Sequence, residues 1–173
     1  MRKINRYLSI LTLAVLVGCS TTSGVGPDVS RSGFDGARKV NIDPHSNACE
    51  WSACTGLGAQ WSSATPAHAI LIVSIIGEIN AILGAKLSVD GKEYDLTVLM
   101  PSTTFNEPGA VAKESRKAFA VPLDLIRKIT TSQRTWLRVL TPEGHIENAV
   151  IDGQTDSKAY HALKRFLIAV NQG

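Results

Sequence analysis

The stretch AKLSVDGKEYDLTV, residues 85–98, constrains the fold more than any other part of the chain. At its centre lies Asp90-Gly91, a pair that favours a two-residue turn of type I′ because both central residues need positive φ. Pairing the flanking residues across this turn separates an apolar face from a polar face, so the sequence predicts an antiparallel β-hairpin. The predicted pairs are Val89 with Lys92, Leu87 with Tyr94 and Ala85 with Leu96 on one face, and Ser88 with Glu93 and Lys86 with Asp95 on the other.

Further strands are predicted on both sides of this hairpin. Residues 69–77 (AILIVSIIG) are the most apolar run, too short to span a bilayer, and favour a strand buried on both faces over a membrane-inserting segment. Residues 135–140 and 146–151 predict a second hairpin about a turn at Pro142-Glu143-Gly144. Residues 37–43 predict a first strand that ends at Asp43-Pro44, because proline restricts the residue before it.

Two helices are predicted in the C-terminal half. The first is a short helix beginning near Pro122, in which Asp124 and Lys128 form an i,i+4 pair. The second begins at Asp156 or Ser157, either of which can cap it, and ends near Val170. The side chains expected to face the core are Leu125, Ile126 and Ile129 in the first helix, and Tyr160, Leu163, Phe166, Leu167 and Val170 in the second.

These elements predict the α+β class: one antiparallel sheet of five to seven strands, with the short helix and the C-terminal helix packed on it. A two-sheet β-sandwich with peripheral helices is the alternative. Residues 33–173 are expected to form a single globular domain, and residues 20–32, rich in Ser, Thr, Gly and Pro, a flexible tether. Residues 101–117 show no period and are expected to form a long loop, either functional or disordered.

The N-terminus has the build of a secretory signal. Basic residues at positions 2, 3 and 6 precede an apolar stretch of ten residues, 8–17, and the stretch ends in Leu16-Val17-Gly18-Cys19. This ending resembles the lipobox of bacterial lipoproteins. The resemblance implies that residues 1–18 are cleaved off, that the Cys19 thiol is lipidated and that the new amino terminus is acylated. An ordinary signal peptide that happens to carry a cysteine is the alternative.

The resemblance also implies a location. A lipidated Cys19 would attach the chain to the membrane, and Ser20 is not the aspartate associated with inner-membrane retention, so we expect a lipid anchor in the outer membrane of the bacterial envelope. Removing the signal takes away three of the 18 Lys and Arg residues and none of the 15 Asp and Glu residues. The balanced charge that remains gives no argument for binding nucleic acid or anionic lipid, and no nucleic-acid partner is expected.

The segment NACEWSACTGLGAQW, residues 47–61, carries the densest chemistry. With Cys19 assigned to lipid, Cys49 and Cys54 remain in an oxidising compartment and are predicted to form a structural disulfide. The metal and redox alternatives lack support: a zinc site needs four ligands, and a thioredoxin-like site needs two residues between its cysteines. The glycines of TGLGAQW predict a turn. No metal and no cofactor are assigned.

No catalytic motif is recognisable around His45, His68, His145 or His161, and no catalytic residue is assigned. The leading expectation is therefore a non-enzymatic lipoprotein, facing the periplasm or the cell surface, that acts in protein–protein interaction or envelope structure. The first alternative is a module that binds a small or lipid-like ligand in a pocket under Trp51 and Trp61. The second is a histidine-dependent hydrolase. The candidate contacts with a partner or ligand are Trp51, Trp61 and Phe105. The loop that the Cys49–Cys54 disulfide would close, called the stapled loop, and residues 101–117 are expected to form the contact surface.

Overall fold

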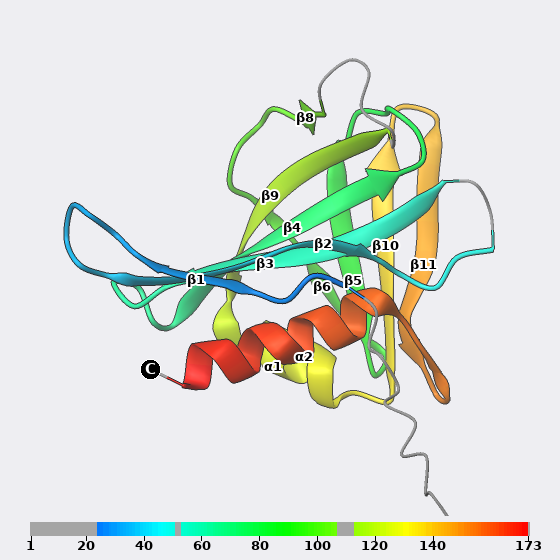
Figure 1. The fold of residues 1–173 in the computed structure, drawn as a ribbon. Coiled ribbons are helices and arrows are strands. Elements are labelled where there is room, and N and C mark those ends of the chain that lie inside the picture. Colours follow the sequence, from blue (N-terminus) through cyan, green and yellow to red (C-terminus); the bar gives the residue numbers. More distant parts are fainter. Residues whose placement is uncertain (1–23, 51–52, 107–112, 173) are drawn as a thin grey trace, which may run out of the picture.

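The computed structural model describes residues 24–50, 53–106 and 113–172, which form two antiparallel sheets and two helices (Figure 1). The seven-stranded sheet has the order β1-β2-β3-β4-β9-β7, and β8 also pairs with β9. Its strands are β1 (Asp28–Arg31), β2 (Arg38–Ser46), β3 (Cys54–Ser62), β4 (His68–Ile76), β7 (Thr97–Val98), β8 (Thr104–Phe105) and β9 (Glu114–Pro122). The architecture is compatible with the predicted α+β class, although strands predominate.

The second sheet has five strands in the order β12-β11-β10-β5-β6. The division into two sheets departs from the single sheet expected first and agrees with the two sheets of the alternative. The strands are β5 (Gly84–Val89), β6 (Lys92–Asp95), β10 (Arg134–Thr141), β11 (Gly144–Asp152) and β12 (Thr155–Asp156), and the helices are α1 (Leu123–Thr131) and α2 (Lys158–Asn171). Buried side chains of both sheets and both helices belong to one apolar cluster, in which Phe119 and Phe166 are the largest.

The hairpin predicted at residues 85–98 is confirmed. Asp90 and Gly91 have φ angles of 47° and 84°, and Lys86 pairs with Asp95 and Leu87 with Tyr94 in the predicted register. The chain then leaves the five-stranded sheet after β6 and enters the seven-stranded sheet as β7. On the other side a bridge between Ala48 and Ala149 also links the two sheets. The two sheets are therefore linked at two places, by the chain between β6 and β7 and by the bridge from Ala48 to Ala149.

The turn predicted at TGLGAQW is wrong, because these residues belong to β3, a central strand. Gly58 explains the error. A Cβ atom at this position would lie 2.6 Å from the carbonyl oxygen of Ile42 and 2.7 Å from the nitrogen of Pro44. β2 does not stop at Asp43-Pro44 as predicted but continues to Ser46 through an irregularity in its register with β3. The proline is accommodated by this bulge, and the glycine allows the bulge to approach β3 closely.

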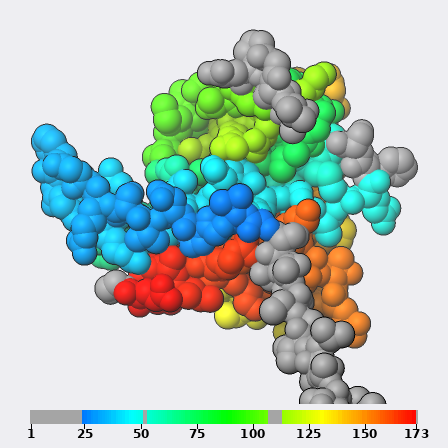
Figure 2. Space-filling view, viewed as in Figure 1, coloured from blue at the N-terminus to red at the C-terminus, as the bar shows by residue number. Residues whose placement is uncertain are grey.

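Two segments predicted to be irregular are partly ordered in strands. Residues 28–31, assigned to the tether, form β1, which pairs with β2 from Asp28↔Asn41 to Arg31↔Arg38. Together with the start of β2 they project from the body as an arm, residues 28–39 (blue and light blue in Figure 2). Within the predicted loop 101–117, residues 104–105 form β8 and residues 114–117 begin β9, while residues 107–112 lie outside the described part.

The remaining local predictions agree with the structure. β4 occupies the predicted strand, although its outer-face residues Ile70 and Ile72 are only half-buried. The second hairpin is formed by β10 and β11. Ser157 caps α2 by accepting a hydrogen bond from the backbone N–H of Tyr160 at 3.1 Å. The predicted core residues of α1 are buried, and Lys128 Nζ lies 2.8 Å from the Asp124 carboxylate.

The predicted signal peptide and lipobox, residues 1–19, lie outside the described residues, as do residues 20–23 of the predicted tether. Among the residues that are described, no helix combines the length and hydrophobicity needed to cross a bilayer.

Candidate functional site

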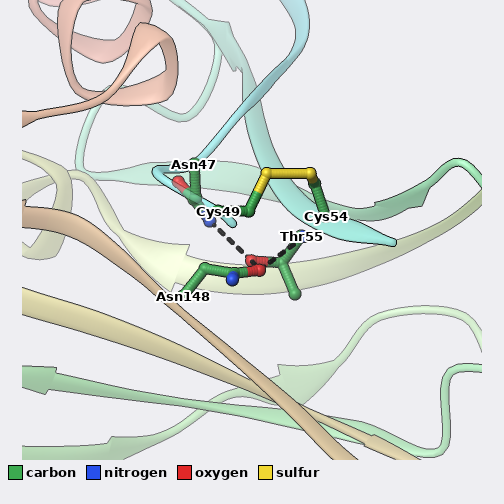
Figure 3. The surroundings of a disulfide bond; sticks show 5 residues. All are labelled: Asn47, Cys49, Cys54, Thr55 and Asn148. Atoms are coloured by element: carbon green, nitrogen blue, oxygen red, sulfur yellow. Dashed lines mark hydrogen bonds between the residues drawn. A yellow bond between two sulfur atoms is a disulfide. The ribbon is translucent and has the colours of Figure 1, made fainter. Parts of the chain in front are cut away.

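The predicted disulfide between Cys49 and Cys54 is present, with their Cα atoms 5.6 Å apart (Figure 3). It closes the connection between β2 and β3 at one end of the seven-stranded sheet. Trp51, the candidate contact residue inside this loop, lies outside the described residues.

A buried polar network lies beside the disulfide (Figure 3). Asn47 Nδ2 donates to Thr55 Oγ1 at 2.9 Å. Thr55 in turn donates to Asn148 Oδ1 from its backbone nitrogen at 2.8 Å and from its hydroxyl at 2.9 Å. All three residues are buried. The stapled connection is thus attached to β11 of the other sheet, which fixes the position of this end of the molecule.

Lys117 holds two loops together at the same end. Its side chain is 6% exposed, and its ammonium group donates to the carbonyl oxygens of Ile82 at 2.8 Å and Pro101 at 2.7 Å. Thr103 adds a second link, because its hydroxyl accepts from the nitrogen of Ile82 at 3.0 Å. Ser115 accepts from the nitrogen of Asn80 at 2.9 Å. The loops 77–83 and 99–103 are therefore bound to each other and to β9.

These joined loops and the adjacent β8 carry exposed apolar side chains. We call this region the apolar end. Its large apolar residues have exposed fractions between 48% and 58%; they are Ile79, Leu83, Met100 and Phe105. A contiguous exposed apolar patch is typical of a surface that binds another molecule, whereas apolar side chains exposed singly are common on any protein.

Strand register shows that the stapled loop and Phe105 share one end of the sheet. Thr55 pairs with Ile75, Ile75 with Ser115, and Ser115 with Phe105, so these residues form one row across β3, β4, β9 and β8. Trp61 lies six residues further along β3, about 20 Å away at ~3.3 Å per residue. The structure therefore brings together two parts of the predicted contact surface and places Trp61 elsewhere.

Trp61 lines a groove of about 560 Å³ near the base of the arm. The groove has an apolar part formed by Ile70, Leu99 and Ala120, and polar side chains that include Lys39, Asn41, Gln60 and His68. Trp61 Nε1 donates to the carbonyl oxygen of Pro66 at 3.1 Å. Asn41 Oδ1 is buried without a hydrogen-bond partner.

Three of the four histidines contact groups other than a hydroxyl nucleophile. His45 Nδ1 lies 2.7 Å from the carbonyl oxygen of Asp43, His145 Nε2 3.5 Å from Glu147, and His161 Nε2 2.7 Å from Asp156. Within the described ranges, the structure shows no hydrogen bond between a histidine and a serine. The same ranges contain no group of three or more His, Cys, Asp or Glu residues arranged to hold a metal ion.

Lys117 and most of the apolar end were not predicted from the sequence. The sequence did contain a pattern that indicates an inward-facing Lys117. Phe119 and Val121 alternate towards the core, and the same alternation continued towards the N-terminus reaches Lys117 and Ser115. A lysine at an inward position needs buried oxygen acceptors, which here come from loops that have no periodic pattern.

No family model matches this chain, and neither a curated protein nor a solved structure matches it.

Proposed function

We propose that this protein is a lipoprotein of the bacterial envelope, anchored through Cys19, whose apolar end binds a protein partner. The observation that carries the proposal is the apolar end itself: Ile79, Leu83 and Met100 are exposed on loops that the buried Lys117 joins, and Phe105 is exposed on the adjacent β8. The lipobox resemblance supports the anchor and the outer-membrane location.

Rigidity is the reason to assign this surface to a protein partner. Side chains on loops that are already ordered lose less conformational entropy on binding than those on mobile loops. The hydrogen bonds of Lys117, Thr103 and Ser115 provide this order. Phe105 and Met100 are large apolar side chains of the kinds enriched at protein interfaces, where a few residues supply most of the binding free energy.

The position of the surface also supports the proposal. The chain enters the described structure at Gly24, beside α2, whereas β8 lies at the opposite end of the molecule in Figure 1. With the anchor on the α2 side, the apolar end faces away from the membrane and is accessible to a partner in the neighbouring compartment.

The proposal is tested by crosslinking in cells followed by purification of the tagged protein. A Phe105→Ser variant is compared with Phe34→Ser, a matched control because Phe34 is a fully exposed aromatic at the tip of the arm. We expect one partner to be recovered with the native protein and with Phe34→Ser, and to be lost with Phe105→Ser and with the unanchored Cys19→Ala form. Equal recovery with Phe105→Ser and the native protein contradicts the assignment of the surface.

The groove beside Trp61 supports a second candidate function, the binding of a small or lipid-like ligand. The supporting observation is that an apolar surface in this groove adjoins the unpartnered Asn41 Oδ1. Native mass spectrometry of protein purified from the envelope tests this candidate. In an Ala120→Trp variant the new ring would fill the groove. A small molecule that is bound to the native protein and absent from this variant supports ligand binding in the groove. Native protein free of any small molecule contradicts it.

A further inference from the structure

The C-terminal helix α2 has an uncompensated positive charge. It contains no Asp or Glu between Lys158 and Asn171. Lys158, Lys164 and Arg165 supply the charge. At 100° per residue these three side chains, together with His161 and Ile168, fall within an arc of about 120°. They therefore form one face of the helix, which we call the basic face, and the exposed Ile168 lies between its cations.

The cations of the basic face differ from five cations elsewhere in the molecule that have carboxylate partners. Lys86, Arg116, Lys128, Arg134 and Arg138 each lie within 4 Å of a carboxylate. Within residues 24–50, 53–106 and 113–172, no carboxylate forms an ion pair with Lys158, Lys164 or Arg165. The carboxylate at the start of the helix, Asp156, is hydrogen-bonded to His161.

Arg165 has hydrogen-bond partners for only one of its three side-chain nitrogens. Its Nε and Nη1 atoms are buried without a partner, and its Nη2 atom lies 3.4 Å from His45 Nε2 and 3.5 Å from the carbonyl oxygen of Val25. No neighbouring negative charge offsets a guanidinium group that lacks a carboxylate partner, and the attraction of such a group to an anion is strongest where water is excluded.

The start of the described chain lies against this face. A Cβ atom at Gly24 would be 2.3 Å from His45 Nε2 and 3.1 Å from Arg165 Nη2, so the backbone passes directly over the two side chains. Five residue steps separate Gly24 from Cys19, a span of at most about 18 Å in a fully extended chain. A lipid attached to Cys19 therefore keeps the basic face close to the headgroups of the bilayer that holds the lipid.

We propose that the basic face of α2 docks on the phosphate groups of anionic lipids in the leaflet that holds the anchor. The inference rests on the proposed lipid anchor and adds a second, electrostatic contact to it. Lys158 and Lys164 approach the lipid phosphates, and Ile168 enters the interfacial region between them. The balanced charge of the mature chain concealed this site, because the compensating acids lie on other surfaces. Docking orients the domain with its apolar end away from the membrane.

A fluorescent probe on the lipidated mature protein tests the docking. The probe is attached to Ile168→Cys under non-reducing conditions that keep the native disulfide intact, and a matched probe on Leu83→Cys, equally exposed at the apolar end, is the control. Each protein is reconstituted into phosphatidylcholine vesicles that carry a brominated lipid quencher, with or without phosphatidylglycerol as a quarter of the lipid.

We expect several-fold stronger quenching at position 168 than at position 83 in the anionic vesicles. High salt and a Lys158→Gln, Lys164→Gln double variant should reduce quenching at position 168 to its level in neutral vesicles, because screening and charge removal both weaken attraction to phosphate. Unchanged urea unfolding of the double variant shows that its fold is intact.

Two results contradict the inference in distinguishable ways. Equal, weak quenching at both positions while the protein still sediments with the vesicles contradicts the docking and leaves the anchor in place. Protein that does not sediment with the vesicles contradicts the lipid anchor, and the docking with it.

Discussion

Asn148 Oδ1 accepts hydrogen bonds from both the backbone nitrogen of Thr55, at 2.8 Å, and its hydroxyl group, at 2.9 Å. The two residues are 93 positions apart in the chain and belong to β11 and β3, strands of different sheets. One carbonyl oxygen therefore attaches the disulfide-closed end of the seven-stranded sheet to the five-stranded sheet.

An Asn148→Ala substitution should destabilise the protein. It leaves the buried N–H of Thr55 without an acceptor, and we expect the free energy of unfolding to fall by about 1–3 kcal/mol. Urea unfolding followed by circular dichroism measures the change. Glu143→Ala, in an exposed turn, is the control and should change stability by less than about 0.5 kcal/mol. Equal stabilities of the two variants would show that the network contributes nothing.

Lys117→Met should loosen the apolar end without altering its surface. The substitution keeps an unbranched side chain but leaves the carbonyl oxygens of Ile82 and Pro101 without their donor, so we expect a loss of about 1–3 kcal/mol in the free energy of unfolding. Hydrogen exchange should increase in residues 77–83 and 99–103. The same variant should recover less of the partner than the native protein does. Native exchange rates in both loops would contradict the role given to Lys117.

Gly58→Ala should be destabilising because the added methyl group meets backbone atoms. The nearest are the carbonyl oxygen of Ile42 at 2.6 Å and the nitrogen of Pro44 at 2.7 Å, neither of which can move without displacing the bulge in β2. We expect a loss of about 1–3 kcal/mol in urea unfolding. Gly33→Ala is the matched control, because its added Cβ would meet no atom within 4 Å. A Gly58→Ala protein as stable as this control contradicts the close approach.

The pair Asp124–Lys128 should give a small pH dependence of stability. The hydrogen bond from Lys128 lowers the pKa of Asp124 from its ordinary value of 3.8, so the unfolded chain binds more protons in this range. The stabilisation is therefore complete above pH 3.8 and is lost as the pH falls through the lowered pKa. The native protein should be slightly more stable than Asp124→Asn near neutrality, and the difference should disappear in acid. A difference that persists in strong acid contradicts this origin.

Local sequence patterns predicted the elements whose structure depends on neighbouring residues. Asp90-Gly91 indicated the turn and register of β5 and β6, and Ser157 indicated the start of α2, because a turn or a cap uses groups within a few positions. β3 was missed because its glycines were taken to indicate a turn, whereas Gly58 allows the close approach of β2. β1 was missed because the strand with which it pairs, β2, lies on the other side of a loop. Contacts between distant segments decide both cases.

The candidate site was predictable only in part. The spacing of Cys49 and Cys54 and their expected compartment indicated the disulfide, and Phe105 was identified as an aromatic outside any periodic element. The rest of the apolar end depends on loops 77–83 and 99–103 meeting around Lys117. Neither loop has a pattern that indicates the other, so only the folded structure shows that they meet.

The most direct test of the central claim is site-specific photo-crosslinking in living cells. A photoreactive amino acid replaces Phe105 at the apolar end or, as the control, Phe34 at the tip of the arm. The proposed function predicts a discrete crosslinked protein adduct from position 105, none from position 34, and loss of the adduct when Cys19→Ala removes the anchor. An adduct from position 34 alone, or no adduct from position 105, would contradict the claim that the apolar end is the partner-binding surface.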